Sequence, residues 1–365
     1  MRTVTGIALV AGLLGVHVSP AAELDLDDID LPQGFVIEEY ASVPNARSLA
    51  LGDDGVVFVG NRRATSVYAV VPSGDARPDV IELVTDLEMP NGIAYYNGDL
   101  YVAELSHILR YRDVMSHLSG VSAPETLDVE LPQERHHGWR YIGFGPDGKL
   151  YVSVGAPCNV CDRDAEGFAQ IWRMNPDGSG KESFAQGIRN TVGFTWHPQT
   201  GDLWFTDNGR DMLGDDLPPD ELNVASRPGM HFGYPYCHGG DIPDPEFGKG
   251  QDCNDFVPPV QKLGPHVAAL GARFYTGDMF PEGYRGQLFI AEHGSWNRSK
   301  KIGYRVMAVT LEEGAPVVYD VFADGWLRKD EVSGRPVDLL VMPDGSMLVS
   351  DDLGGKLFRI SYEGD

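Results

Sequence analysis

The sequence predicts an all-β fold, a six-bladed β-propeller, and three observations support this prediction. One hairpin pattern recurs six times along the 365 residues. The chain contains 44 glycines and 25 prolines, which suits many short strands joined by tight turns. Amphipathic helical periodicity is scarce, which disfavours an architecture of alternating helices and strands.

The repeated pattern is a turn that ends in glycine, followed by one variable residue and three apolar residues. Turns such as Asn97-Gly98 and Asp147-Gly148 favour hairpins because their residues tolerate a positive φ. The six turn glycines are Gly55, Gly98, Gly148, Gly201, Gly286 and Gly345. Their blade-like spacing predicts one hairpin in each of six blades, an arrangement that leaves few exposed sheet edges. A segment rich in proline, glycine and aspartate, residues 208–263, is predicted to be a long inter-blade insertion.

The N-terminus predicts a secretory signal peptide over residues 1–22. Arg2 supplies the positive charge, and residues 7–16 form an apolar stretch that is too short to cross a bilayer. Small residues follow, where a signal peptidase could cleave. An uncleaved anchor or a buried first strand is the alternative interpretation. We therefore expect residues 23–365 to form a single propeller domain, periplasmic or secreted, with no membrane span after signal removal.

The four cysteines fall in two local pairs, Cys158 with Cys161 and Cys237 with Cys253. Export to an oxidising compartment favours two disulfides. A redox-active pair or half of a zinc site is the alternative for the first two. Because Asp162 stands where a c-type haem attachment motif would need histidine, a covalently bound haem is not indicated.

Polar residues just before the first strand of each hairpin should converge on one mouth of the central channel. They are Asn45 with Arg47, Asn91, His136 with His137, Arg189 with Asn190, His266 and Arg335. The chain has a formal net charge of −25, which makes nucleic acid a poor partner. A basic ring in such an acidic protein predicts a pocket for an anion that carries several carboxylates or phosphates. The alternative is that these side chains cap strands and bind loop carbonyls.

Residues just after each hairpin should return to the same face. They include Arg62, Arg63, Glu104, Glu292, His293, Asp351 and Asp352. The segment 207–216 is the richest in acidic groups and free carbonyls, which are oxygen ligands of the kind that Ca²⁺ prefers. It lacks the spacing of an EF-hand loop.

At this point the sequence resembles the soluble sugar dehydrogenases that depend on pyrroloquinoline quinone (PQQ). The segments that carry this resemblance are residues 136–152, 187–193 and 220–235. Three further segments resemble the L-sorbosone dehydrogenase-like branch of that family, namely residues 155–161, 209–215 and 291–298. The resemblance extends over residues 31–362.

The resemblance implies a role for individual residues. His137 matches the general base of the family, and His136 beside it is the structural histidine. Arg189 and Asn190 match the pair that contacts the quinone, and Arg189 would stabilise charge there during catalysis. The main-chain carbonyls of Gly209 and of Arg210 match those that hold Ca²⁺.

The resemblance also extends to the last two blades, with departures. Arg335 matches a basic residue that binds a PQQ carboxylate, but Val337 stands where a second arginine is expected. The lysine expected near the fifth hairpin is missing too, which leaves His293, Arg298 or Lys300 as substitutes. The remaining candidates for cofactor binding are Arg47, Asn91 and His266.

Together these features predict a quinoprotein that oxidises an aldose or a sorbosone-like sugar aldehyde at C1. Its cofactors would be PQQ and Ca²⁺, and an external electron acceptor would be needed because the sequence has no haem motif. Two other functions stay open. A calcium-dependent lactonase or another hydrolase would require a carboxylate-rich metal centre, and a non-catalytic propeller would serve as a binding module.

Overall fold

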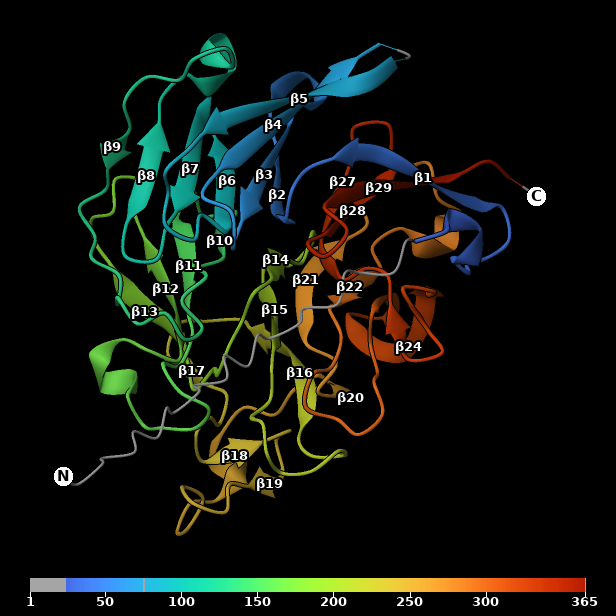
Figure 1. The fold of residues 1–365 in the computed structure, drawn as a ribbon. Coiled ribbons are helices and arrows are strands. Elements are labelled where there is room, and N and C mark those ends of the chain that lie inside the picture. The colour runs from blue at the N-terminus through green and yellow to red at the C-terminus, as the bar shows by residue number, and fades with distance from the viewer. Residues whose placement is uncertain (1–23, 75, 365) are drawn as a thin grey trace, which may run out of the picture.

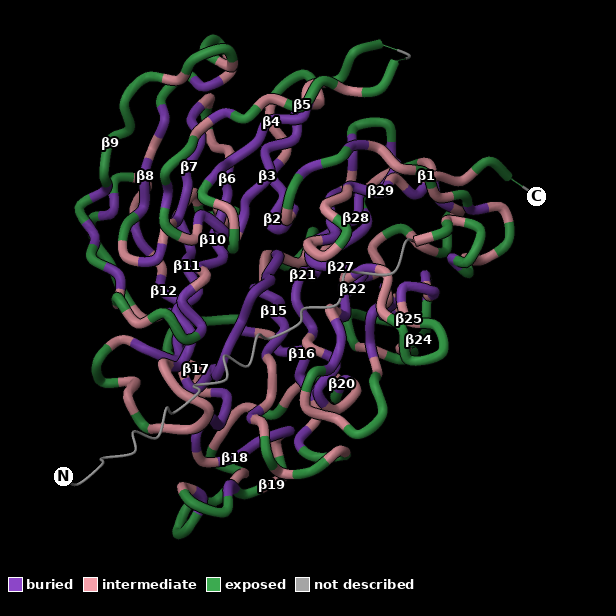
Figure 2. Tube along the Cα trace, in the orientation of Figure 1, coloured by how far each residue is buried: buried purple, intermediate pink, exposed green. Residues whose placement is uncertain are grey.

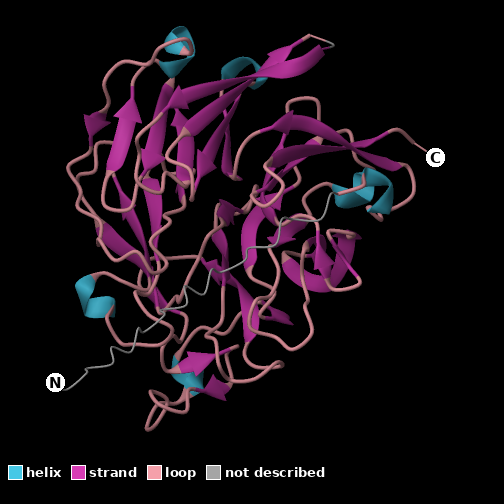
Figure 3. Ribbon diagram, viewed as in Figure 1, coloured by secondary structure: helices cyan, strands magenta, loops and turns pink. Residues whose placement is uncertain are grey.

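The computed structural model describes residues 24–74 and 76–364, so the expected signal peptide over residues 1–22 lies outside the described part. The fold is the predicted six-bladed β-propeller, with its sheets arranged in a ring (Figure 1). Strands dominate in Figure 3. The helices of the described residues are short 3₁₀ segments, and none is long and apolar enough to cross a membrane. They are η1 (Leu26–Asp28), η2 (Asp53–Gly55), η3 (Val114–His117), η4 (Asp164–Glu166), η5 (Cys253–Asp255) and η6 (Glu282–Tyr284).

The first three blades follow one another along the chain. Blade one contains β2 (Ala46–Leu51), β3 (Val57–Asn61), β4 (Val67–Ser73) and β5 (Ala76–Val84). Blade two contains β6 (Gly92–Tyr96), β7 (Asp99–Ala103), β8 (Ile108–Tyr111) and β9 (Glu125–Thr126). Blade three contains β10 (Ile142–Phe144), β11 (Leu150–Val154), β12 (Gln170–Met174), β13 (Glu182–Gln186) and β17 (Met230–His231).

The last three blades complete the ring. Blade four contains β14 (Phe194–Trp196), β15 (Leu203–Asp207), β16 (Pro219–Ala225) and β20 (Gln261–Pro265). Blade five contains β21 (Ala269–Phe274), β22 (Leu288–Glu292), β23 (Arg305–Glu312) and β24 (Ala315–Ala323). Blade six contains β27 (Pro336–Val341), β28 (Met347–Asp351), β29 (Lys356–Tyr362) and the N-terminal strand β1 (Phe35–Ser42). Because β1 pairs with β29, both ends of the chain build one blade and close the ring (Figure 1).

The six predicted hairpins join the two inner strands of each blade. Gly98 and Gly148 have φ values of +87° and +70°, which a side chain would strain. The second strand of each hairpin is buried along its whole length, as in β3 and β28. Figure 2 shows this buried core in purple, with the exposed residues toward the outer strands and loops. Apolar side chains of neighbouring blades pack together; Phe58 of β3 and Leu100 of β7, for example, belong to one cluster.

The segment 208–263 differs from the expected inter-blade insertion. It contains β16 and the start of β20, so the extra chain lies within blade four rather than between two blades. Asp220 and Glu221 occupy buried positions of β16, so no apolar run marks this strand in the sequence. Between β16 and β20, β17 joins blade three in parallel with β13. Two small hairpins lie outside the blades: β18 (Cys237–His238) with β19 (Ile242–Pro243), and β25 (Leu327–Arg328) with β26 (Glu331–Val332).

Candidate functional site

A cavity of ≈ 550 Å³ lies at the mouth of the channel where the strand ends converge. Side chains that precede or follow the inner hairpins line it. Eight of the predicted site residues are among them, namely Arg47, His137, Arg189, Asn190, Gly209, His266, His293 and Arg335. Asn91, Arg210 and Arg298 are not. The predicted convergence on one mouth is therefore present, with three exceptions.

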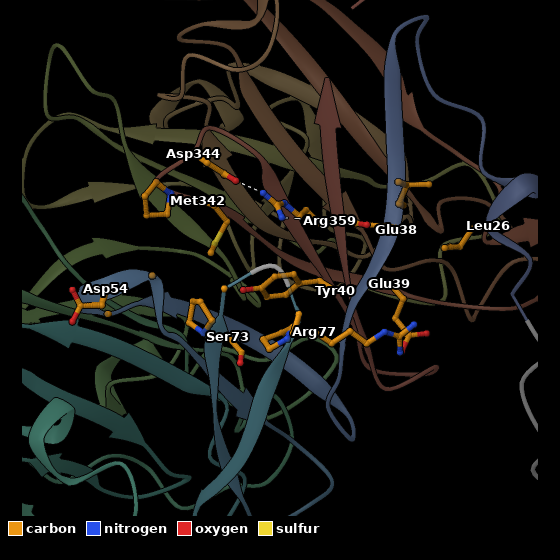
Figure 4. Close-up of a pocket in the computed structure, with 18 residues that line it drawn as sticks. Leu26, Glu38, Glu39, Tyr40, Asp54, Ser73, Arg77, Met342, Asp344 and Arg359 are labelled. Atoms are coloured by element: carbon orange, nitrogen blue, oxygen red, sulfur yellow. Dashed lines mark hydrogen bonds and ion pairs between the residues drawn. The ribbon is translucent and has the colours of Figure 1, made fainter. Parts of the chain in front are cut away.

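A larger cavity of ≈ 1060 Å³ lies at the hairpin turns between blades six and one (Figure 4). Its charged groups pair with one another. Arg359 forms ion pairs with Asp344 and with Glu38, the latter at 3.9 Å, and Arg77 lies 3.8 Å from Glu39. Because these guanidinium groups already have carboxylate partners, this cavity lacks the uncompensated charge that an anion would need.

His137 is held as a neutral base at the mouth. It is buried with φ at +50°, and its Nδ1 lies 2.8 Å from the carbonyl oxygen of Ala156. Since a carbonyl only accepts hydrogen bonds, Nδ1 carries the proton and Nε2 keeps its lone pair. Burial, followed by the positive charge of Arg189 and by His136, holds the pKa of His137 well below 6.5. His136 also lines the cavity, but it is exposed whereas His137 is buried.

Arg189 is fixed by partners on every side. Its Nε donates to the carbonyl of Asn159 at 2.8 Å, and its Nη2 donates to Oδ2 of Asp211 at 2.9 Å. Its Nη1 donates to the carbonyl of Asn208 at 3.2 Å. The amide of Asn190 lies 3.4 Å from Oδ1 of Asn208. Arg189 therefore enters the cavity as a rigid group whose charge Asp211 largely balances.

Asp207, at the end of β15, orders the backbone of this pair. Its carboxylate accepts hydrogen bonds from the main-chain N–H groups of Arg189 at 2.8 Å and of Asn190 at 2.6 Å. Burial and the nearby carboxylate of Glu221 raise the pKa of Asp207 well above 3.8, although these two N–H groups act in the opposite direction.

Arg47 and His293 share one carboxylate, that of Asp352. Arg47 forms an ion pair with it, and Nε2 of His293 lies 2.9 Å from its Oδ1. Burial alone would raise the pKa of Asp352, but the charges of His293 and Arg47 hold it far below 3.8. Asn91 is buried behind this network, where its Oδ1 accepts from Nε of Arg47 at 2.8 Å and its Nδ2 donates to the carbonyl of Arg140. Asn91 therefore orients Arg47 instead of making the predicted direct contact with a cofactor.

Two guanidinium groups at the mouth have no acidic partner. Within residues 24–74 and 76–364, neither Arg62 nor Arg335 has a carboxylate within 4.0 Å, and Nε of Arg335 is buried without a hydrogen bond. Arg62 stacks on Trp139, with 3.6 Å between its Cζ and the ring centroid. Burial and the charge of Arg47 lower the pKa of Arg62 to about 10. Arg62 and Arg335 are therefore available to bind an anion at the mouth.

Arg62 and Trp139 were not among the expected cofactor ligands. Arg62 was noted only as a residue that follows the first hairpin, and Trp139 belongs to the same segment as His137. Their stacking joins blade one to the loop before blade three. The position of Arg62 directly after the first hairpin could therefore have marked it as a site residue. Nothing in the sequence predicts that it stacks on Trp139.

Arg298 and Arg210 point to other partners. Arg298 donates to the carbonyl of Asp215 and lies 3.6 Å from a carboxylate oxygen of Asp216, so it joins two loops instead of entering the cavity. Arg210 forms an ion pair with Asp244. The prediction for Arg210 concerned its main-chain carbonyl and is unaffected by this pairing.

A metal at this mouth would depend on main-chain oxygens. The described part of the chain has no group of three or more histidine, cysteine, aspartate or glutamate side chains placed to hold a metal ion. Gly209 lines the cavity, and its N–H donates to Oδ1 of Asp220 at 2.9 Å. The carboxylate-rich centre that a calcium-dependent hydrolase requires is not found in this part.

Both predicted disulfides are present, Cys158–Cys161 and Cys237–Cys253. The first encloses Asn159, whose carbonyl and side-chain oxygens accept from Arg189. This disulfide therefore supports the cavity wall directly.

A family model described as TrAA12-like matches residues 30–363. An uncharacterised protein from Borreliella burgdorferi is 33% identical over 362 residues, which cover 95% of this chain and 94% of that protein. A pyrroloquinoline quinone-dependent pyranose dehydrogenase from Coprinopsis cinerea is 32% identical over 129 residues, which cover 30% of this chain and 17% of that protein.

Solved structures share the fold at lower identity. A Trichoderma reesei carbohydrate-active enzyme of family AA12 superposes with a TM-score of 0.81 at 20% identity, covering 96% of this chain and 100% of that one. The PQQ domain of the Coprinopsis cinerea pyranose dehydrogenase, in its holo form, has a TM-score of 0.79 at 18% identity, covering 94% and 99%. The soluble aldose sugar dehydrogenase of Escherichia coli has a TM-score of 0.67 at 19% identity, covering 90% and 99%.

Proposed function

Because the chain belongs to the TrAA12-like family, we propose that it is a PQQ-dependent oxidoreductase acting on sugars. Its substrate would be an aldose or a sorbosone-like sugar aldehyde, oxidised at C1. The observation that carries this proposal is one cavity that combines the free Nε2 of His137 with two guanidinium groups, Arg62 and Arg335, that have no carboxylate partner among the described residues.

The cavity fits the chemistry of PQQ, which is flat and carries three carboxylates. Arg62 and Arg335 would bind carboxylates, and the orphaned Nε of Arg335 is a donor that such an oxygen would satisfy. Arg47 and His293, linked through Asp352, would support the same side. When bound, PQQ would supply the quinone that takes up two electrons from the sugar.

Calcium would be held by the main-chain carbonyls of Gly209 and Arg210, together with oxygens of the cofactor. Such oxygen ligands suit a hard cation, and no side-chain carboxylate cluster is required. The bond from the Gly209 N–H to Asp220 would fix the loop in position for this role.

His137 would remove the proton from the C1 hydroxyl of the sugar or of an aldehyde hydrate. Its Nδ1–H is held by Ala156, so Nε2 is the atom that faces the substrate and accepts the proton. Burial, and after it the positive charge of Arg189, would keep this base unprotonated before the substrate arrives, because both lower the pKa of His137. Arg189 would also stabilise negative charge that develops beside it.

The electrons would then pass to an external acceptor. The two disulfides are typical of an oxidising compartment, which supports a periplasmic or secreted location.

The direct test is a titration of the purified mature protein with PQQ and Ca²⁺, followed by dye reduction with a panel of aldoses and sugar aldehydes. We expect saturable, Ca²⁺-dependent uptake of PQQ, seen as a change in its absorbance, and sugar-dependent dye reduction. Lack of PQQ uptake would contradict the proposal. Lactone hydrolysis without dye reduction would favour the hydrolase instead.

A matched set of arginine variants localises the cofactor. Arg62→Ala and Arg335→Ala should each weaken PQQ binding by roughly 10- to 100-fold, because a hydrogen bond to a charged group contributes about 1.5–3 kcal/mol. Arg359→Ala is the control, since Arg359 lines the other cavity. Equal effects of all three variants would argue against PQQ at the mouth.

A further inference from the structure

The short loop that the Cys158–Cys161 disulfide closes reaches the cavity wall through one residue, Asn159. The carbonyl of Asn159 accepts from Nε of Arg189 at 2.8 Å, and its Oδ1 accepts from Nη2 of Arg189 at 2.9 Å. These are two of the four hydrogen bonds that the Arg189 side chain forms within the described residues. The orientation of Arg189 therefore depends on where Asn159 lies.

Asn159 also holds the acidic partner of Arg189. Its Oδ1 accepts from the N–H of Asp211 at 2.8 Å, and its Nδ2 donates to the carbonyl of Asp211 at 3.1 Å. The Asp211 carboxylate in turn accepts from Arg189 at 2.9 Å. One asparagine thus positions both the guanidinium group and the carboxylate that balances its charge.

Few main-chain bonds hold this loop. Among the described residues, no main-chain group of residues 157–162 bonds to another main-chain group. The N–H of Cys161 donates to the hydroxyl of Tyr234 at 3.0 Å, and Cys158 packs against a small apolar cluster that includes Tyr234. The disulfide joins two residues that are three apart in the sequence. It therefore supplies much of the restraint that regular secondary structure gives to other site residues.

The two disulfides differ in their exposure. Cys158 and Cys161 are both partly exposed. In the other disulfide Cys237 is buried, with 2% of its surface exposed, and Cys253 is partly exposed. Because thiol–disulfide exchange requires that a thiolate reach one of the sulfurs, access limits its rate. We expect a dithiol to open the first disulfide before the second.

We propose that the Cys158–Cys161 disulfide is a redox-sensitive clamp on Arg189, and that Asn159 is the positioning residue through which it acts. When the disulfide opens, the loop gains conformational freedom, so Asn159 leaves Arg189 and Asp211 and the guanidinium group loses its fixed orientation. The consequence for catalysis rests on the proposed function, in which Arg189 acts beside the cofactor. The consequence for the geometry of the wall does not.

Opening the clamp transfers two electrons and two protons. A thiolate of a dithiol reductant attacks one sulfur of the bridge, which breaks the S–S bond and forms a mixed disulfide. The second thiol of the reductant then displaces that cysteine. Cys158 and Cys161 end as thiols, and the reductant ends as a disulfide. Exchange with an oxidised dithiol reverses each step, so an oxidising compartment keeps the clamp closed.

Hydrogen exchange in the PQQ-free protein tests the clamp directly. Dithiothreitol should open Cys158–Cys161, as followed by thiol labelling, and should speed exchange of the Asp211 N–H about 10-fold, because this group loses its acceptor on Asn159. The N–H of Arg189 donates to Asp207 and should keep its protection as the internal control. Reoxidation should restore the slow exchange.

Two cysteine variants identify which disulfide is responsible. Cys158→Ser/Cys161→Ser should show fast exchange of the Asp211 N–H with or without dithiothreitol. Cys237→Ser/Cys253→Ser should respond to dithiothreitol as the parent protein does. Unchanged exchange of Asp211 after full reduction of Cys158 and Cys161 would overturn the proposal.

Activity of the PQQ-loaded protein tests the consequence for catalysis. Because thiols reduce quinones, variants replace the reductant in this assay. Cys158→Ser/Cys161→Ser and Asn159→Ala should each lower kcat/KM for the sugar by about 10- to 100-fold. Combining them should lower it no further, since both remove the same contacts.

Asn254→Ala is the matched control for Asn159→Ala. Asn254 follows Cys253 of the other disulfide, and its side chain donates to Asp252 on the surface. This variant should stay within a few-fold of the parent protein. Additive losses in the combined variant would show that the disulfide and Asn159 act separately, and would overturn the proposal. So would a change in Asp211 exchange without a loss of kcat/KM.

The two measurements also separate the clamp from the proposed function. If exchange of Asp211 follows the state of the disulfide but PQQ is not taken up, the clamp stands and the proposed function fails. If PQQ is taken up and sugars are oxidised while neither Asp211 exchange nor kcat/KM depends on the disulfide, the clamp fails and the proposed function stands.

Discussion

Replacing His137 tests whether this residue is the base. Asn is the suitable replacement because it tolerates the positive φ of this position, and its amide can still donate toward Ala156. His136→Asn is the matched control, since His136 has the same side chain one residue earlier but is exposed. Both variants should keep the fold and the affinity for PQQ.

The magnitude follows from what the buried imidazole would do. A positioned general base contributes about 10²- to 10⁴-fold to the rate, which corresponds to roughly 2.7–5.5 kcal/mol of barrier. The Nδ1–H bond to Ala156 fixes Nε2 as the only free basic atom of His137. Replacing His137 should therefore lower the rate by a factor in the upper part of this range. The effect should appear in kcat/KM for the sugar, because the missing interaction is made in the transition state.

The assay is steady-state dye reduction with saturating PQQ and Ca²⁺, beside a PQQ titration of each variant. His137→Asn should reduce kcat/KM by about 10³- to 10⁴-fold while binding PQQ normally. His136→Asn should stay within a few-fold of the parent protein. The reasoning would be refuted if His137→Asn retained more than about a tenth of the activity with PQQ bound, or if His136→Asn showed the larger loss.

Three further predictions concern pH, the buried charges and the second disulfide. Because burial holds the pKa of His137 well below 6.5, kcat/KM should stay level as the pH falls through 6.5 and decline only below it; a midpoint at or above 6.5 would contradict this. Asp352→Asn should lower the free energy of unfolding by about 3 kcal/mol in urea, since it leaves the buried Arg47 without its anion. Asp352 contributes to the free energy of unfolding fully at pH values above the ordinary carboxyl pKa of 3.8. This contribution is lost as the pH falls toward the depressed pKa that Asp352 has in the folded state. Replacing Cys237 and Cys253 by serine should cost about 3 kcal/mol by thermal unfolding, because the bridge closes a loop of 16 residues.

The hairpins could be predicted because their information is local. Gly98 and Gly148 follow asparagine and aspartate directly, and the apolar residues after them form the buried second strand. A few neighbouring residues are enough to specify such a turn. Repetition then gave the number of blades, and this prediction is confirmed.

Blade four was harder to predict because its third strand buries charge. Asp220 and Glu221 lie inside β16, where Asp220 accepts from the main-chain N–H groups of Gly209 and Ala269. Hydrogen bonds, not apolar contacts, hold these carboxylates. A pattern based on apolar residues therefore assigned this strand to an insertion.

The sequence located the mouth of the channel but not the direction of each side chain. Asn91 and Arg298 both occur near it in the repeat, yet Asn91 is occupied by Arg47 and Arg140, and Arg298 by Asp215. Whether a polar side chain is free or satisfied depends on residues that are distant in sequence. Such pairings arise only when the ring closes.

The charge of the site is consequently not the sum of its basic residues. Arg189 is balanced by Asp211, and Arg47 by Asp352, so these arginines shape the wall and add little net charge. The uncompensated charge belongs to Arg62 and Arg335. Burial lowers the pKa of Arg62 most; the charges of Arg47 and Arg335 lower it further, and the carboxylate of Asp352 acts in the opposite direction. A bound anion would offset the charges of Arg62 and Arg335 as well as make new bonds. These two cavity groups have no carboxylate partner among the described residues, and they are the strongest physical reason to expect a polycarboxylate at the mouth.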